Sequence, residues 1–247
     1  MNQDPGRGPA LYLSSEHACG YLPGLNARTL FVDPLARMNG RLYQRLLEHG
    51  FRRSGSHVYR PACARCHACI PLRIPVRAFS PNRSQRRTWE RNRAALSLRE
   101  RPPQFDSMHF ALYRRYIEVR HADGSMADAS VASYEDFLLS PWGGETRLLE
   151  LRLEDRLMAV AVTDVLEHAL SAVYTFFDPE LAAHAPGTLA VLCQIGEAQR
   201  QGLDWLYLGY WIEECRKMSY KDRFRPVEAW IDGAWRPVDR GAEIPWR

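Results

Sequence analysis

The fold is decided by residues 146–177, TRLLELRLEDRLMAVAVTDVLEHALSAVYTFF. Three apolar runs in this stretch, each bounded by charged or polar residues, predict strands at Thr146–Leu153, Leu157–Val165 and Ala169–Phe177. Strands that follow one another across short loops predict a mainly antiparallel sheet. The flanking segments then decide what covers this sheet.

Helical patterns flank the three strands on both sides. Before them, a helix capped by Asp106 or Ser107 carries apolar residues on one face, and 134–139 predicts a second, short helix. After them come a helix over 188–201 and a strand over 203–210, followed by an irregular tail. Sequential strands with helices before and after them are typical of the α+β class.

The N-terminal part predicts a smaller α+β unit that carries a cysteine-rich loop. Asp33-Pro34 opens a helix, because Asp caps free amides and Pro suits the first helical position, and Gly50 ends it. A hairpin over 51–60 and a strand over 72–76 follow.

A Pro-Pro pair at 102–103 marks the best candidate domain boundary. A chain of 247 residues allows one large domain or two small ones, since domains usually span roughly 100–200 residues. We therefore divide the chain into an N-terminal unit, residues 1–103, and a larger domain, residues 104–247.

The composition is that of a soluble globular protein, with 46% apolar and 25% charged residues. No run of about 18 apolar residues is present to span a membrane. The N-terminus also lacks the basic and apolar stretches of a secretory signal. We therefore expect no membrane partner, a cytoplasmic location, and free thiols rather than disulfides.

Arginine is concentrated between residues 77 and 101, where eight arginines stand against only Glu90 and Glu100. They are Arg77, Arg83, Arg86, Arg87, Arg91, Arg93, Arg99 and Arg101. A solvated helix face usually alternates its charges, so this stripe favours contact with a phosphate backbone. A solvated helix with spare charge is the alternative interpretation.

The sharpest motif is Cys63-Ala-Arg-Cys66-His-Ala-Cys69. Two-residue gaps allow consecutive thiolates to turn toward one zinc ion or iron–sulfur cluster, and Cys19 supplies a fourth sulfur if the fold brings it near. The alternative is three reduced thiols in a tight loop, packed as small apolar residues. Spacing alone leaves both interpretations open.

Two strand ends carry most of the remaining polar chemistry. Residues 207–228, YLGYWIEECRKMSYKDRFRPVE, interleave aromatic and basic side chains, which suits stacking on a terminal base and binding phosphates. The alternative is a strand end with a solvated basic loop. The other strand end is Val173-Tyr174-Thr-Phe-Phe-Asp178-Pro179, where Asp178 either caps the turn at Pro179 or accepts protons in a site.

Five segments in the same order resemble the arginyl-tRNA–protein transferase family, and most closely its bacterial branch. They are Cys19-Gly20-Tyr21-Leu-Pro-Gly, the loop from Tyr59-Arg60-Pro61 to Cys69, Ser84-Gln85-Arg86-Arg87, 173–179 and 207–228. Two departures stand out. Leu22 replaces a cysteine of eukaryotic relatives, and His184-Ala-Pro-Gly187-Thr188 replaces a segment that in relatives often begins with arginine.

The resemblance implies a C-terminal acetyltransferase-like (GNAT) domain and a specific reaction. Members donate an amino acid from aminoacyl-tRNA to a protein N-terminus, which marks that protein for degradation. The bacterial branch implies leucine as the donated residue and proteins that begin with aspartate or glutamate as acceptors. The implied partners are Leu-tRNA and these acceptor proteins, and the transfer chemistry requires no cofactor.

Attack of an α-amine on an activated ester needs proton removal, donors for the oxyanion, and a cation for the acceptor's acidic side chain. We expect Asp178 or Glu213 to handle the proton. We expect Arg73, Arg77 or Lys221 to bind the acidic side chain. The predicted catalytic residues are Asp178, Tyr174, Tyr210, Glu213 and Lys221. The predicted substrate-binding residues are Arg73, Arg77, Ser84, Arg86, Arg87, Tyr207, Gly209 and Tyr220. The predicted metal ligands are Cys19, Cys63, Cys66 and Cys69.

Two other classes of protein share parts of this pattern. An acetyl-CoA-dependent acetyltransferase shares the expected fold, but this chain lacks the Gln/Arg-x-x-Gly-x-Gly/Ala loop that opens a pyrophosphate-binding helix. A non-catalytic tRNA- or RNA-binding protein with a Cys-bound metal accounts for the arginines and the cysteines. It does not account for the tyrosine and aspartate residues at the strand ends.

Overall fold

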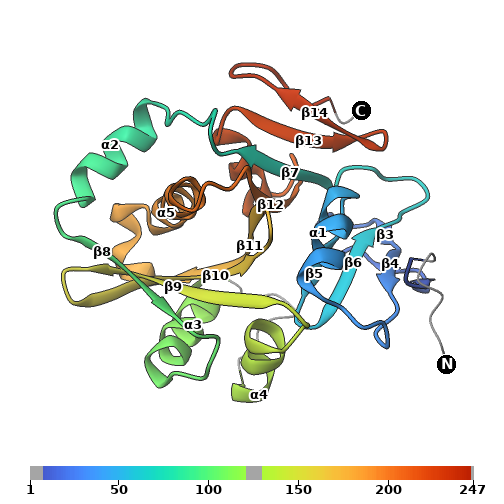
Figure 1. Ribbon diagram of the computed structural model, residues 1–247, viewed down its shortest axis with the longest axis horizontal. Coiled ribbons are helices and arrows are strands. Elements are labelled where there is room, and N and C mark those ends of the chain that lie inside the picture. The colour runs from blue at the N-terminus through green and yellow to red at the C-terminus, as the bar shows by residue number, and fades with distance from the viewer. Residues whose placement is uncertain (1–7, 121–129, 246–247) are drawn as a thin grey trace.

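The computed structural model describes residues 8–120 and 130–245, which form three sheets and the helices around them (Figure 1). The strands are β1 (Leu11–Leu13), β2 (His17–Ala18), β3 (Asn26–Ala27), β4 (Thr29–Val32), β5 (Arg52–Ser54), β6 (His57–Pro61), β7 (Ile70–Pro75), β8 (Leu96–Arg101), β9 (Glu145–Leu153), β10 (Arg156–Val165), β11 (Ala169–Phe177), β12 (Trp205–Trp211), β13 (Val227–Ile231) and β14 (Ala234–Val238). The helices are α1 (Gly40–Glu48), α2 (Arg83–Asn92), α3 (Ser107–Arg120), α4 (Val131–Tyr134), α5 (Pro186–Arg200) and α6 (Arg216–Ser219), with a π-helical turn η1 (Glu135–Leu139) and 3₁₀ turns η2 (Pro179–His184) and η3 (Tyr220–Arg223). The α+β class is confirmed, and no helix of the described residues is long and apolar enough to cross a membrane.

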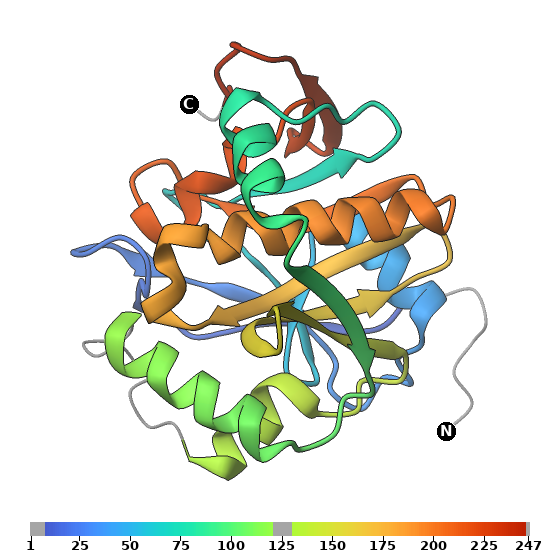
Figure 2. The same ribbon diagram turned by 90° about the vertical axis from the view of Figure 1, so that its left-hand side faces the viewer.

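The large sheet has eight strands in the order β14-β13-β7-β12-β11-β10-β9-β8. Neighbouring strands are antiparallel except β11 and β12, which run parallel. Strand β10 is buried on both faces, so its alternate residues pack against different helices. Ala159 and Ala161 face α5, whereas Val160 and Val162 face α3. Figure 2 shows the result, with α5 and α3 on opposite sides of the strands.

Two predictions about the arginine-rich segment and the C-terminus are wrong. Helix α2 ends at Asn92, and Arg99 and Arg101 lie on strand β8, which pairs with β9. The expected single helical stripe is therefore divided between a helix and an edge strand. The tail expected to be irregular contains the hairpin β13–β14, which extends the large sheet beyond β7.

The predicted helix at Asp33-Pro34 begins later in the chain. Helix α1 follows Asn39, whose side chain accepts a hydrogen bond from the backbone N–H of Leu42. Asp33 instead caps a turn by accepting from the N–H of Leu35, a side chain that is 86% exposed. Because Leu35 is exposed to solvent, a helical turn at Asp33-Pro34 would bury no apolar surface. The helix therefore starts later, after the cap at Asn39.

The strands β7 and β8 precede the predicted boundary at residue 103, and both belong to the large sheet. Outside that sheet lie helix α1 and a four-stranded sheet in the order β1-β4-β6-β5. The two parts share a core in which Tyr43 and Leu47 of α1 pack with Trp142 and Tyr207. The division at residue 103 stays a prediction, and the large sheet draws strands from both sides of it.

A buried ion pair joins the small sheet to the large one. Arg53 on β5 is 1% exposed, and its Nε and Nη2 donate to the two carboxylate oxygens of Asp164 on β10, at 2.6 and 2.5 Å. The hydroxyl of Thr146 on β9 accepts from Arg53 Nη2 and from Trp142 Nε1. Because a buried charge is stable only when it is paired and hydrogen-bonded, this network fixes β5 against β9 and β10.

Candidate active site between two diverging strands

Strands β11 and β12 are hydrogen-bonded only at their starts, from Ala169 to Ser171 on β11. Just beyond, each strand has one extra residue relative to its other neighbour. Val173 is the extra residue of β11 against β10, and Leu208 is that of β12 against β7. Such bulges bend a strand and leave a backbone group unpaired, so the two strands separate at this point.

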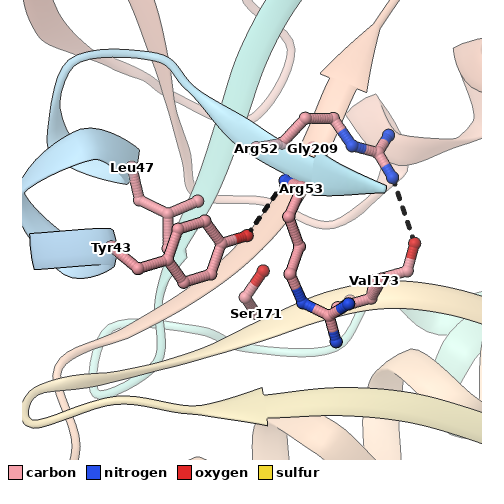
Figure 3. A pocket seen from close by; sticks show the side chains of 8 residues that line it. Tyr43, Leu47, Arg52, Arg53, Ser171, Val173 and Gly209 are labelled. Carbon is pink, nitrogen blue, oxygen red and sulfur yellow. Dashed lines mark hydrogen bonds between the residues drawn. The ribbon is translucent and has the colours of Figure 1, made fainter. Parts of the chain in front are cut away.

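The side chain of Arg52 occupies the opening between the strands (Figure 3). Its Nη2 donates to the carbonyl oxygen of Val173 at 3.1 Å, and its guanidinium lies 5.8 Å from the ring centre of Tyr210. Gly209 has φ +72°, and a Cβ at that position would lie 3.1 Å from Nη1 of Arg52. The glycine therefore provides the space for the guanidinium.

On the inner side of Arg52 and the adjacent Arg53, the strands enclose a small cavity. Its lining includes Tyr43, Leu47 and Ser171, and its volume is about 10 Å³. This is the room of about one water molecule. A substrate must therefore reach Arg52 from the outer side, where the side chain keeps some solvent exposure.

Two predicted catalytic residues, Tyr210 and Lys221, lie beside Arg52. The Nζ of Lys221 donates to the backbone oxygen of Tyr210 at 2.6 Å, and the side chain is 6% exposed. Burial and the positive charge of Arg52 lower the pKa of Lys221 to about 7. The hydroxyl of Tyr210 donates to the carbonyl oxygens of Gly50 and Tyr59, at 3.1 and 3.2 Å.

Further tyrosines surround these two cations. Burial, with the nearby Tyr59, raises the pKa of Tyr21 to about 12. Burial also raises the pKa of Tyr220 to about 12, with a smaller contribution from Tyr116. At neutral pH these hydroxyls are protonated, so they are hydrogen-bond donors rather than anions.

The remaining predicted catalytic residues lie elsewhere or are engaged. Asp178 caps η2, accepts from the N–H of Glu180, and pairs with Arg156 at 2.6 Å and with Arg115 at 3.6 Å. The ring of Tyr174 packs 5.0 Å from that of Phe137, and its buried hydroxyl has no hydrogen-bond partner among residues 8–120 and 130–245. Glu213 lies exposed after the end of β12. The turn-capping interpretation of Asp178 therefore fits its contacts better than the proton-accepting one.

The cations expected for the acceptor's acidic side chain already have partners. The guanidinium of Arg73 lies between the rings of Trp205 and Trp235, at 3.7 and 4.4 Å from their centres. It pairs with Glu228 at 2.7 Å and also donates to the hydroxyl of Tyr207. Arg77 is exposed and pairs with Asp204 at 3.4 Å. The charge of Arg73 is thus neutralised inside the protein.

Three of the four predicted metal ligands gather around one apolar cluster. Cys19, Cys66 and Cys69 lie there with Cys215, whereas the sulfur of Cys63 points to a backbone oxygen 3.8 Å away. Burial and the neighbouring thiols raise the pKa of Cys69 to about 12, which keeps it protonated. Across the described residues, no group of three or more His, Cys, Asp or Glu is placed to hold a metal ion. The side chains as arranged do not fit zinc or an iron–sulfur cluster, and that site stays a prediction.

Helix α2 presents the predicted basic surface next to Lys221. Its exposed residues include Arg83, Ser84, Arg86 and Arg87. Its buried face is polar, and Gln85 donates through Nε2 to the backbone oxygen of Arg223 at 3.1 Å. Arg223 ends η3, the turn that carries Lys221. The arginine-bearing helix is therefore fixed directly to the candidate site.

Sequence reasoning missed the most central side chain, Arg52. The sequence signal for it was the pair Arg52-Arg53 on a short predicted strand. Adjacent residues of a strand face opposite sides, so two adjacent arginines place a charge on each side of the strand. Tyr21 and Tyr59 were noticed only as parts of motifs. The place of Tyr59 beside Arg52 follows from the pairing of β5 with β6, which spacing alone does not specify.

Comparison with known proteins identifies the family of this chain. The family model for the C terminus of arginine-tRNA-protein transferases matches residues 108–231, and the model for the N terminus matches residues 17–87. The chain belongs to this family, and the resemblance stated from its sequence is confirmed. Its sequence is also close to individual curated members.

An aspartate/glutamate leucyltransferase from Pseudomonas fluorescens (strain Pf0-1) is 50% identical over 226 residues, which cover 91% of this chain and 94% of the relative. A protein of the same name from Hahella chejuensis (strain KCTC 2396) is 50% identical over 224 residues, covering 91% and 95%. Among solved structures, the C-terminal domain of a putative lysylphosphatidylglycerol synthetase from Agrobacterium fabrum is 13% identical. It has a TM-score of 0.43 and covers 71% of this chain and 53% of that one.

Replacing Gly209 by alanine tests how the opening is formed. Gly209→Ala adds the strain of a positive φ, about 1–2 kcal/mol, and requires the Arg52 guanidinium to shift, which weakens its hydrogen bond to the Val173 oxygen and costs up to about 1 kcal/mol more. Gly202→Ala is the matched control, because Gly202 has φ +71° and no atom within 4 Å of the added carbon. Urea unfolding should show the larger loss for Gly209→Ala. Equal losses would mean that Arg52 does not depend on this space.

Proposed function

We propose that this chain transfers leucine from Leu-tRNA to the N-terminal α-amine of proteins that begin with aspartate or glutamate, marking them for degradation. The observation that carries this proposal is the 50% identity, over 91% of the chain, to relatives named for that activity. The cluster of Arg52, Tyr210 and Lys221 supports it, because such a transfer needs a cation for the acidic residue and a group that takes a proton.

In this reaction the α-nitrogen of the acceptor forms a bond to the leucyl carbonyl carbon. The ester bond to the terminal ribose of the tRNA breaks, the nitrogen loses a proton, and the ribose oxygen gains one. The α-amine has a pKa of about 7.7–8, so a useful fraction is neutral at cellular pH. A Lys221 amine with a pKa of about 7 is matched to receive the proton that the nitrogen loses.

The donor tRNA is proposed to contact helix α2. Arg83 and Arg87 are exposed one turn apart, and neither makes a side-chain hydrogen bond or ion pair within residues 8–120 and 130–245. Positive charge without a protein partner suits phosphate contacts. The fixed contact between α2 and η3 supports a donor whose backbone lies on α2 while its acylated end reaches Lys221.

The same proposal includes the finer fold assignment. An acetyltransferase-like core is supported by the mixed sheet, in which the only parallel pair in the described part of the chain, β11 and β12, separates at the candidate site. Where two parallel strands diverge, their backbone N–H and C=O groups have no partner on the neighbouring strand, so a substrate in the cleft can hydrogen-bond to them. Here that position is held by Arg52, which donates to the carbonyl of Val173.

The direct test uses purified protein with radiolabelled Leu-tRNA or Arg-tRNA and peptides that begin with Asp, Glu, Lys or Ala. Transfer from Leu-tRNA to the Asp and Glu peptides alone is the expected result. Transfer from Arg-tRNA instead would keep the family and overturn the donor. Binding of tRNA without transfer to any peptide would favour the non-catalytic RNA-binding alternative.

The pH dependence of transfer tests Lys221. Both Lys221 and the acceptor amine must be neutral for transfer. A plot of log kcat/KM against pH should therefore have a slope of about 2 below pH 7 and level off above about pH 8. Lys221→Arg, which stays charged, should lose about 10²–10⁴-fold in kcat/KM and keep only the inflection of the amine. If Lys221→Arg retained both inflections, Lys221 would not be the group that takes the proton. Lys221→Met repeats the same pH profile with an uncharged side chain.

Salt titration of tRNA binding tests helix α2. Arg83→Gln combined with Arg87→Gln should reduce the slope of log Kd against log salt by about 1.4–1.8, since each lost phosphate contact removes about 0.7–0.9. The control pair is Arg41→Gln with Arg45→Gln, two exposed arginines at the same spacing on α1, at the other side of the molecule (Figure 1). Fluorescence anisotropy with labelled Leu-tRNA gives both slopes. Equal slopes for the two pairs would exclude α2 as the binding surface.

A further inference from the structure

Arg52 is a largely buried cation that has no anionic partner in the described part of the chain. Among the residues that the structure describes, its side chain makes a single hydrogen bond, to Val173, and no ion pair. Other sheltered arginines do have a carboxylate partner, since Arg53 pairs with Asp164 and Arg73 with Glu228. A guanidinium has five N–H donors, so most of those of Arg52 are unused. A sheltered charge of this kind is unfavourable unless an anion arrives from outside.

The guanidinium of Arg52 is held in place before any ligand binds. The Val173 oxygen fixes Nη2, the missing side chain of Gly209 gives the group its space, and the ring of Tyr210 lies along it. Two strand bulges create this setting. A binding group that is already oriented loses little entropy when the ligand arrives, so the arrangement favours a specific anion over a passing one.

The surroundings of Arg52 favour a carboxylate. The side chains that interact most strongly with the charge of Arg52 are those of Tyr59, Tyr21, Tyr210 and Tyr43, and burial raises the pKa of Tyr21 to about 12. The protonated hydroxyl of Tyr21 can donate a hydrogen bond to an anion and does not compete for the guanidinium. Tyr21 is 38% exposed, which places this donor at the surface rather than in the core.

We propose that Arg52 binds the side-chain carboxylate of the acceptor's first residue, and that it is the residue that restricts acceptors to those beginning with aspartate or glutamate. This inference rests on the function proposed above. Tyr210 lies between the two groups that the reaction needs, with Arg52 over its ring and Lys221 on its backbone oxygen. A first residue whose carboxylate pairs with Arg52 presents its α-amine, a few bonds away, toward Lys221.

The experiment measures transfer from Leu-tRNA to peptides that begin with Asp, Glu, Asn or Gln. Arg52→Gln removes the charge and retains a donor for Val173, and Arg52→Lys retains the charge without the paired donors. Arg60→Gln is the matched control, because Arg60 also donates to one backbone oxygen, that of His49, and lies 5.0 Å from an aromatic ring centre.

For Arg52→Gln we expect KM for the Asp and Glu peptides to rise about 10–100-fold, while KM for Leu-tRNA and the rate with Asn and Gln peptides change little. The preference for Asp over Asn should therefore collapse, return in part with Arg52→Lys, and stay intact in Arg60→Gln. Thermal unfolding of each variant shows whether it is folded.

If the wild-type protein transfers leucine but folded Arg52→Gln loses activity equally on Asp and Asn peptides, Arg52 does not recognise the acidic side chain. If the wild-type protein transfers nothing, the proposed function fails instead. Should Arg52→Gln not fold, the test is the ratio of kcat/KM for the Asp peptide to that for the Asn peptide, measured with Arg52→Lys. If this ratio and the KM for the Asp peptide both stay at the wild-type values, the guanidinium does not recognise the carboxylate through paired hydrogen bonds.

Discussion

The structure depends on the buried pairing of Arg53 with Asp164. This pair is the polar link through which the small sheet holds its position against β10, and it is completed by the hydroxyl of Thr146. Because successive residues of a strand face opposite sides, fixing Arg53 toward Asp164 also fixes the direction of Arg52. The three-residue strand β5 therefore carries two charges: that of Arg53, which Asp164 neutralises, and that of Arg52, which no carboxylate of the described residues neutralises.

The site formed around Arg52 is made largely of backbone and aromatic groups. The bulges at Val173 and Leu208 separate β11 from β12, and Gly209 keeps the opening free of a side chain. Lys221 reaches the same point from the turn after β12, where burial and Arg52 bring its pKa near 7. Carboxylates are not part of this arrangement in the described chain, which distinguishes it from the arrangement expected around Asp178 and Glu213.

Local sequence patterns predicted the elements whose shape is set locally. Strands β9 to β11 were predicted because their apolar runs are long and bounded by polar turns, and the hairpin β5–β6 because Gly55 marks its turn. Strand β8 and the hairpin β13–β14 were not, because charged and tryptophan-rich sequences form strands there only by pairing with β9 and β7. Tertiary pairing of this kind overrides local preference.

The candidate site was predictable only in part, for the same reason. Tyr210, Gly209 and Lys221 lie in one segment, so their motif identified them together. Arg52 reaches Val173 across 121 residues, and no local pattern indicates that contact. Arg73 was expected to be available, but its partner Glu228 lies 155 residues further along the chain.

These long separations also determine the order in which the molecule can be completed during synthesis. The hairpin with Arg52 and Arg53 leaves the ribosome first, but Asp164 follows 111 residues after Arg53, and Gly209 and Lys221 come later still. Contacts between such distant residues form late, because the chain must first close a long loop. In the nascent N-terminal half, Arg52 and Arg53 therefore still lack these contacts, and the site is complete only after Lys221 has been made.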